Sequence, residues 1–179
     1  MLTRLYNILD SFILTIITNI EGNIGSRFRY LYYSKKLRNC SGYIMSSSGF
    51  RIFNPSSVSI GRGCHFNHGV IIDSNNNISI GDDVLVGPYT VIRDSNHRYE
   101  NPDKTISSQG HNLGNITIGN DVWIGATVVL IDGANVKDHS IIAAHSLVNK
   151  EIPSCEVWGG VPAKFLKKRG ESKHERIGN

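Results

Sequence analysis

Cysteine is scarce in this sequence, and long apolar runs are absent. The three cysteines among 179 residues, Cys40, Cys64 and Cys155, are widely spaced and form no C-x-x-C pair. An odd number at such spacings argues against a disulfide framework or a structural zinc site, and fits a reducing cytoplasm. The apolar N-terminal segment is too short and too polar to span a bilayer, which takes about 20 mostly apolar residues. No small-residue cleavage site follows it, which disfavours a signal peptide.

The charge is weakly basic and unevenly distributed. The net charge is +4, and basic residues crowd 27–38 and 164–176. Such clusters suit nucleic acid, an anionic membrane surface or a phosphorylated small molecule. No recognised nucleic-acid motif is present, so a nucleic-acid partner is not expected.

Apolar residues recur every six positions over most of the chain, and a small residue follows four positions after many of them. Neither a helix, with a period of 3.6, nor an ordinary strand, with a period of 2, produces this pattern. A hexapeptide repeat is the signature of a parallel β-helix. The repeat-leading residues are Ile60, Phe66, Ile72, Ile80, Val86, Ile92, Ile118, Ile124, Leu130, Val136, Ile142 and Val148.

Three six-residue steps make one triangular coil, so the repeat predicts an all-β solenoid. Four coils follow from the leading residues, and residues 44–58 are expected to supply a ragged fifth. Stacked coils bury a continuous core that no single coil could bury. The β-helix is therefore expected over residues 44–163, followed by a basic tail over 164–179.

The repeat has one large interruption. The next corner after Ile92 should fall at residue 98, but the period resumes only at Ile118. Residues 93–117 are therefore expected to leave the prism as an excursion loop. A long polar loop inserted into a regular solenoid is more often functional than accidental.

Residues 1–43 form a separate N-terminal segment. Apolar residues from Leu2 to Ile20 fall at steps of three and four, which predicts an amphipathic helix ended by Gly22 and Gly25. The stretch from Arg27 to Arg38 then interleaves aromatic and basic residues. Two alternatives stay open for residues 1–38: packing against the prism or a neighbouring subunit, or peripheral contact with an anionic membrane surface.

Three segments resemble the hexapeptide-repeat acyltransferases, and most of all the galactoside, maltose and nodulation-factor acetyltransferases with their relatives in polysaccharide gene clusters. They are Ile116–Ala126 (ITIGNDVWIGA), Ile141–Lys150 (IIAAHSLVNK) and Gly159–Lys164 (GGVPAK). The resemblance implies a left-handed prism, an exception to the right-handed crossover rule. It also implies a homotrimer with active sites between subunits, and acetyl transfer from acetyl-coenzyme A to a hydroxyl of a sugar or glycan precursor.

A hydroxyl needs a general base near neutral pH, and histidine suits that task. His97, in Arg93-Asp-Ser-Asn-His97, resembles the catalytic histidine of the family. Asn67 matches its acceptor-binding asparagine. By family position, the Ala126 amide would stabilise the oxyanion, with Gly125 allowing close approach. Transfer is then direct, without a covalent acyl-enzyme.

The resemblance also implies the donor site. Trp123 matches a tryptophan that lines the cleft. The family often carries arginine at the positions of Lys164 and Lys167, and threonine at that of Asn149. Lysine keeps the charge but lacks the two-pronged hydrogen bonding of arginine, which weakens the individual phosphate assignments. The implied acetyl-coenzyme A ligands are Trp123, Ala126, Ala144, Asn149, Lys150, Lys164 and Lys167.

Other functions remain as alternatives. An N-acetyltransferase of a nucleotide-linked amino sugar, an antibiotic or serine acetyltransferase, and a non-catalytic β-helix scaffold are each compatible with the repeat. The γ-class carbonic anhydrases use the same prism, but no histidine pair here has the spacing of their zinc ligands, so no metal is expected. The remaining histidines are His65, His68, His111, His139, His145 and His174.

Overall fold

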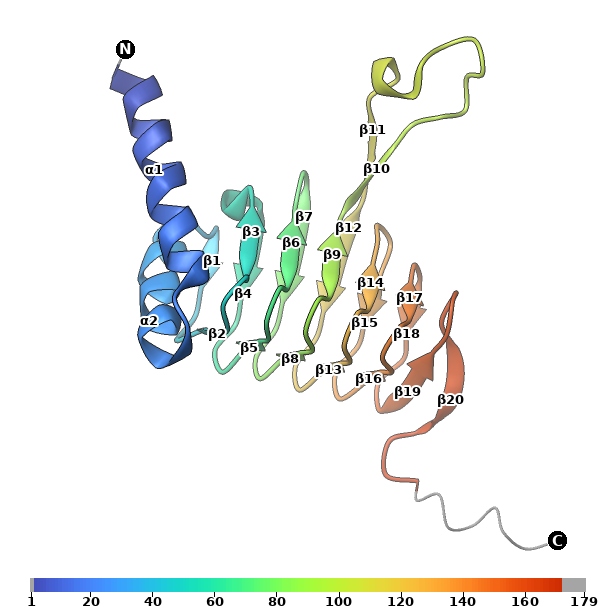
Figure 1. Ribbon diagram of the computed structural model, residues 1–179. Helices are drawn as coiled ribbons and strands as arrows, with labels where there is room; N and C mark the ends of the chain where they lie inside the picture. The colour runs from blue at the N-terminus through green and yellow to red at the C-terminus, as the bar shows by residue number, and fades with distance from the viewer. Residues whose placement is uncertain (1, 172–179) are drawn as a thin grey trace, which may run out of the picture.

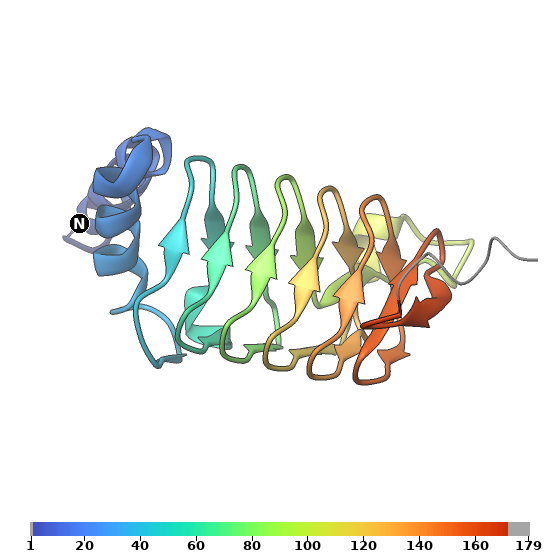
Figure 2. The ribbon, with the colours of Figure 1, turned by 90° about the horizontal axis from the view of Figure 1, so that it is seen from below.

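The computed structural model describes residues 2–171 and consists of a triangular β-prism with two helices at its N-terminal end. Figure 1 shows the coils stacked along one axis, with a single long excursion leaving them. The view from below in Figure 2 shows the same coils in regular succession. The predicted parallel β-helix is confirmed, since the strands of the three prism faces between residues 39 and 159 pair in parallel along the axis.

Each prism face is one sheet. Sheet A contains β1 (Asn39–Cys40), β4 (Val58–Ile60), β7 (Asn77–Ile80), β12 (Asn115–Ile118), β15 (Asn135–Val136) and β18 (Glu151–Ile152). Sheet B contains β2 (Met45–Ser46), β5 (His65–Phe66), β8 (Leu85–Val86), β13 (Trp123–Ile124), β16 (Ile141–Ile142), β19 (Glu156–Gly159) and β20 (Lys164–Lys168). Sheet C contains β3 (Arg51–Phe53), β6 (Ile71–Asp73), β9 (Val91–Arg93), β14 (Val129–Leu130) and β17 (Leu147–Val148).

The core follows the six-residue period. All the repeat-leading residues are buried, and they stack in register from coil to coil. Phe50 of the ragged coil stacks on Phe66, with ring centroids 4.9 Å apart. Burying each column against the next supplies the hydrophobic stabilisation that holds such short strands in place.

The prism has about six coils, and the expectation of four to five was too low. Sheet A alone has six strands, because β1 and β18 add a strand at each end. The first coil, from Cys40 to Ile60, includes a 3₁₀ turn (η1, Pro55–Ser57) and is longer than three six-residue steps. The last coil, from Val136 to Ile152, is shorter. Neither coil length is a multiple of six, so the six-residue period did not predict these two coils.

The excursion is shorter than predicted and carries its own secondary structure. Residues 115–117, expected in the loop, already belong to β12, where Ile116 is fully buried beside Ile78. The excursion contains an antiparallel hairpin of β10 (Ser95–His97) and β11 (His111–Leu113), with a 3₁₀ turn (η2, Ile106–Ser108) between them.

Two helices, rather than one, precede the prism. α1 spans Leu2–Asn19 and α2 spans Gly22–Tyr33. Gly25 does not end the first helix. It lies buried inside α2, where a Cβ atom would collide with the Ile20 carbonyl group. Tyr33 and Leu37 are buried in the prism core, so α2 caps the first coil.

Arg29 joins the two helices to the prism and is almost fully buried. Its guanidinium donates to the Ile17 and Ile20 carbonyl oxygens at 2.8 Å each, and to the Ser46 carbonyl oxygen at 2.6 Å. Burial lowers the pKa of Arg29 below its usual value, although a guanidinium stays charged in proteins. Oriented carbonyl groups thus solvate the buried charge, and the negative charge of Glu21 also favours it.

We expect Arg29→Ala to lower the free energy of unfolding by about 3 kcal/mol, because it leaves buried carbonyl oxygens without donors. Chemical denaturation measures the loss. Arg27→Ala removes an exposed arginine of the same helix and should change stability by less than about 0.5 kcal/mol. Equal losses in the two variants would contradict the anchoring role.

The C-terminal residues are not simply a tail. β20 turns back and pairs antiparallel with β19, with Lys164 opposite Gly159. This extra strand covers the last edge of sheet B, which would otherwise expose unpaired backbone groups. Residues 172–179 of the predicted basic tail, including His174 and Arg176, lie outside the described residues. Within residues 2–171, no helix is long and apolar enough to cross a membrane.

Candidate active site

One corner of the prism, between sheets B and C, holds three of the predicted site residues. Asn67, Ala126 and Ala144 lie in the turns that follow β5, β13 and β16. The Asn67 backbone N–H and its side-chain Nδ2 both donate to the Val86 carbonyl oxygen at 3.0 Å. The Asn67 side chain is therefore fixed against the prism backbone.

The coils approach each other closely at this corner. A Cβ atom on Gly87 would lie 2.5 Å from the Ala126 nitrogen, and one on Gly125 would lie 2.6 Å from the Ala144 nitrogen. Neither the Ala126 nor the Ala144 N–H donates a hydrogen bond to another residue of the described chain. Both amides are thus available to a ligand, as the predicted role of Ala126 requires.

His145 lies beside Ala126, which the sequence did not indicate. The His145 backbone N–H donates to the Ala126 carbonyl oxygen at 3.0 Å, and its Nδ1 is 2.7 Å from the Thr127 Oγ1. Thr127 and His145 both have a positive backbone φ, which residues other than glycine rarely adopt. The sequence indicates His145 only as one of the histidines considered for zinc, because the six-residue repeat does not predict which corner residues lie near the site.

His97 lies on the excursion hairpin and is exposed. It is opposite His111 in the β10–β11 register, and their ring centroids are 4.3 Å apart. A side chain on a paired strand is held more firmly than one on an open loop. The structure therefore gives His97 a defined position and adds a second imidazole next to it.

Asp94 anchors the hairpin to the prism, a role the sequence did not reveal. Its buried carboxylate accepts the backbone N–H of Asn75 at 2.7 Å, of Asn76 at 3.0 Å and of Asn77 at 2.8 Å. It also accepts the Ser74 hydroxyl at 2.7 Å. The step from Ile72 to Ile80 is eight residues instead of six. The two extra residues, near 75–77, allow a turn that binds the base of the excursion.

Asn149 and Lys150 lie at the corner between sheets C and A, where the hairpin leaves the prism. The Lys150 carbonyl oxygen accepts the Asn135 N–H, and the hairpin residue Asn96 bonds through Nδ2 to Asp132 at the same corner. Ala126 and Asp132 are one six-residue step apart, which is one whole prism face. Within one chain, His97, Asn149 and Lys150 therefore lie across sheet C from Asn67, Ala126 and Ala144.

The remaining predicted residues belong to sheet B. Trp123 is 54% exposed on its outer surface, between Leu85 and Ile141 of the neighbouring strands. Lys164 and Lys167 lie on β20, and the Lys167 Nζ donates to the Glu171 carbonyl oxygen at 2.8 Å. Over residues 2–171, none of Lys150, Lys164 and Lys167 forms an ion pair.

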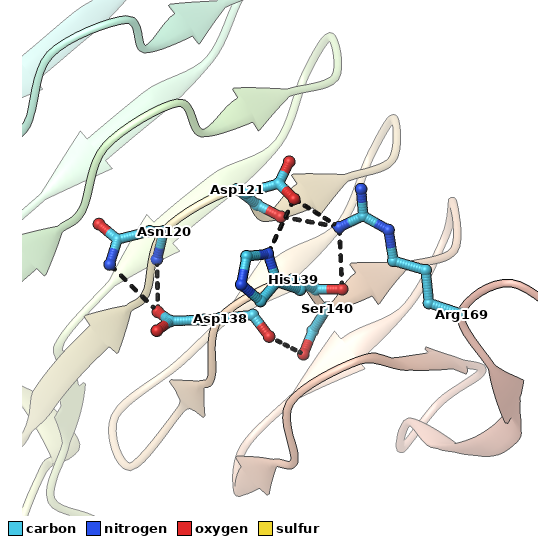
Figure 3. Close-up of polar contacts among 6 residues, drawn as sticks. All are labelled: Asn120, Asp121, Asp138, His139, Ser140 and Arg169. Carbon is cyan, nitrogen blue, oxygen red and sulfur yellow. Dashed lines mark hydrogen bonds and ion pairs between the residues drawn. The ribbon is translucent and has the colours of Figure 1, made fainter.

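A polar network at the corner between sheets A and B holds the C-terminal strand (Figure 3). The Asp121 Oδ2 is 2.8 Å from an Arg169 guanidinium nitrogen and 2.9 Å from the His139 Nδ1. Arg169 also donates to the His139 carbonyl oxygen at 3.1 Å. The hydrogen bonds from His139 and, to a smaller extent, from Arg169 hold the pKa of Asp121 below its usual 3.8. The network fastens β20, which carries two of the predicted phosphate ligands.

A lowered carboxyl pKa stabilises the fold at any pH above the unfolded value, and this stabilisation is lost as the pH falls through the folded pKa. Asp121→Asn should therefore cost less than about 1 kcal/mol at pH 6, because the pair is half exposed. The difference from the wild type should shrink as the pH falls below 3.8. Urea unfolding at several pH values measures this, and a pH-independent difference would contradict the electrostatic explanation.

Two further features concern a cysteine nucleophile and a metal site. Cys64 is buried, and burial raises the pKa of its thiol to about 11, which is unsuited to a nucleophile. Among the described residues, no three or more His, Cys, Asp or Glu side chains form a group that could hold a metal ion.

Comparison with known proteins finds the same repeat elsewhere. Residues 115–150 match the family described as bacterial transferase hexapeptide (six repeats). The matched residues are 36 of the 179, and they span strands β12 to β17. The galactoside O-acetyltransferase of Escherichia coli (strain K12) is 34% identical over 113 residues, which are 63% of this chain and 54% of that relative. A solved galactoside acetyltransferase in complex with coenzyme A superposes with a TM-score of 0.76 at 26% identity, covering 90% of this chain and 79% of that one.

Hexapeptide-repeat relatives include proteins with other activities. A mitochondrial γ carbonic anhydrase of Arabidopsis thaliana is 32% identical over 121 residues, which are 62% of this chain and 44% of that relative. The chain spans about half the length of these curated relatives. The likeness to these proteins therefore agrees with the prism, and the activity has to be argued from the site.

Proposed function

We propose that this protein is an acetyl-coenzyme A-dependent O-acetyltransferase that acts on a hydroxyl of a sugar or glycan precursor. The observation that carries the proposal is the exposed His97 on a hairpin anchored by a buried carboxylate. A general base must be held within hydrogen-bond reach of the hydroxyl. The likeness to acetyltransferases, one of them with coenzyme A in its solved structure, supports the choice of donor.

In this proposal, an imidazole nitrogen of His97 accepts the proton of the acceptor hydroxyl as its oxygen bonds to the acetyl carbon. The Ala126 N–H donates to the carbonyl oxygen, on which negative charge develops. The carbon–sulfur bond then breaks, and His97 returns its proton to the departing thiolate. Asn67 positions the acceptor, and no enzyme nucleophile is needed.

The residues present fit acetyl-coenzyme A as the donor. The open amide of Ala144 can pair with the amide-rich pantetheine arm, alongside Asn149 and Trp123, while that of Ala126 faces the thioester carbonyl at the end of the arm. Lys150, Lys164 and Lys167 supply cations for its phosphates. These assignments are part of the proposal, and each of the three lysines is a candidate phosphate ligand.

We propose a homotrimer with its active sites between subunits, because one prism cannot bring His97 and Ala126 together. The outer surface of sheet A is polar, whereas those of sheets B and C carry apolar side chains. Apolar outer faces are typical of surfaces that are covered in an assembly. On sheets B and C these side chains are Met45, Leu85, Trp123, Ile141, Ile71, Val91, Val129 and Leu147.

A coupled thiol-release assay tests the function. The purified chain is incubated with acetyl-coenzyme A and, in turn, free sugars, nucleotide sugars and lipid-linked glycans. Acceptor-dependent thiol release is expected, and the acetylated product should lose its acetyl group in mild alkaline hydroxylamine, as an ester does. A hydroxylamine-resistant product would favour the N-acetyltransferase alternative, and no release with any acceptor would favour a scaffold.

We also propose that the reaction takes place in the cytoplasm, which fits the three widely spaced cysteines of the sequence.

A further inference from the structure

The exposed side of α1 is apolar. Leu5, Ile8, Leu9, Phe12, Ile13 and Ile16, spaced three and four apart, lie on one face and are between 41% and 64% exposed. On the opposite face, the Asp10 carboxylate bonds to the Tyr32 hydroxyl and pairs with Lys36. A surface helix normally turns its apolar face inward. α1 does the reverse, so its apolar face, called here the α1 stripe, needs a partner.

The neighbouring helix exposes a similar surface with cations added. Ile24, Phe28 and Leu31 of α2 are 67%, 47% and 55% exposed. Arg27 and Lys35 follow the same spacing and are also exposed. Arg27 borders an open groove that Asn23, Tyr43 and Met45 complete, which leaves room for an anionic group beside its guanidinium.

The net positive charge of the chain comes entirely from this region. Residues 1–38 contain six of the 19 basic residues and two of the 15 acidic residues, which leaves 13 of each sign in the rest of the chain. Both acidic side chains have partners, since Asp10 pairs with Lys36 and Glu21 accepts the Ser48 hydroxyl. The helical region therefore has a net charge of +4 and the remainder is neutral.

We propose that α1 and α2 bind the surface of an anionic bilayer, with the α1 stripe inserted at the level of the acyl chains and Arg27 and Lys35 on lipid phosphates. Apolar insertion combined with attraction of basic residues is the usual basis of such peripheral binding. A second copy of the chain is a less suitable partner for this surface. Its prism offers no net negative charge, and its own basic helices would repel α1 and α2. The inference goes beyond the acetyl transfer and does not depend on it.

Co-sedimentation of the full chain with vesicles tests the proposal. The protein should bind vesicles of phosphatidylcholine mixed with phosphatidylglycerol, and bind phosphatidylcholine alone at least about tenfold more weakly. Phe12→Ser should weaken binding about tenfold. Phe53→Ser, which changes an exposed phenylalanine on the prism, is the matched control and should bind as the wild type does.

The charged residues are tested with a matched pair. Arg27→Gln with Lys35→Gln should weaken binding to the anionic vesicles about twentyfold. Arg62→Gln with Lys137→Gln removes the same charge from the prism and should have little effect. The proposal is overturned if the wild type ignores anionic vesicles, or if both pairs weaken binding equally. It is also overturned if Phe12→Ser changes the oligomeric state in sedimentation velocity without vesicles, since the α1 stripe would then join copies of the chain.

Discussion

Replacing His97 with alanine should lower kcat for acetyl transfer by about 10²–10⁴-fold, the usual contribution of a general base. The change should leave the fold intact, because His97 is exposed and its hairpin is held by backbone pairing and by Asp94. The KM for acetyl-coenzyme A should change little, since His97 is not among the proposed donor ligands. Steady-state thiol release, together with the elution volume of the variant, measures all three quantities.

His111→Ala is the matched control, because it removes the other imidazole of the hairpin, 4.3 Å from the first between ring centroids. The rate should fall by less than tenfold. If His97→Ala keeps the full rate while His111→Ala abolishes it, the base has been assigned to the wrong histidine. If neither variant loses activity, the hairpin does not supply the base.

Replacing Asp94 with alanine should have the second largest effect. Three backbone N–H groups and one hydroxyl would lose a buried charged acceptor, so we expect the free energy of unfolding to fall by about 3 kcal/mol or more. The rate should fall as well, because His97 would lose its fixed position. Chemical denaturation and thiol release on the same preparation measure both effects.

Asp103→Asn is the control for Asp94, since this exposed aspartate is in the same excursion. Its effect on stability should remain within about 0.5 kcal/mol. Asp94→Ser should recover little, because one hydroxyl oxygen cannot accept four hydrogen bonds. An Asp94→Ala protein with wild-type stability and rate would show that the carboxylate does not anchor the hairpin.

The repeat predicted most of the prism because each column position is set by burial alone. Ile60, Ile80, Ile118 and Val136 occupy adjacent strands of sheet A as their spacing implied. The period failed where coils change length, as between Cys40 and Ile60, and it said nothing about β20, which pairs antiparallel.

The site was harder to predict than the fold. Spacing places Asn67, Ala126 and Ala144 along one corner, but it cannot show how an excursion returns to the prism. In the sequence, Asp94 stands out only as part of the Arg93–His97 motif, although its four hydrogen bonds hold the excursion. The sequence predicts the α1 stripe as one face of an amphipathic helix, and only the structure shows, through its exposure and the contacts of Asp10, that this face points outward.

Binding of acetyl-coenzyme A to the wild-type chain, followed by isothermal titration calorimetry, tests the central claim most directly. The proposed site predicts saturable binding with one molecule per chain, weakened when Lys150 and Lys164 are both changed to glutamine. Absence of any saturable binding by the folded wild-type protein would contradict the proposed enzyme, whatever the positions of His97 and Ala126.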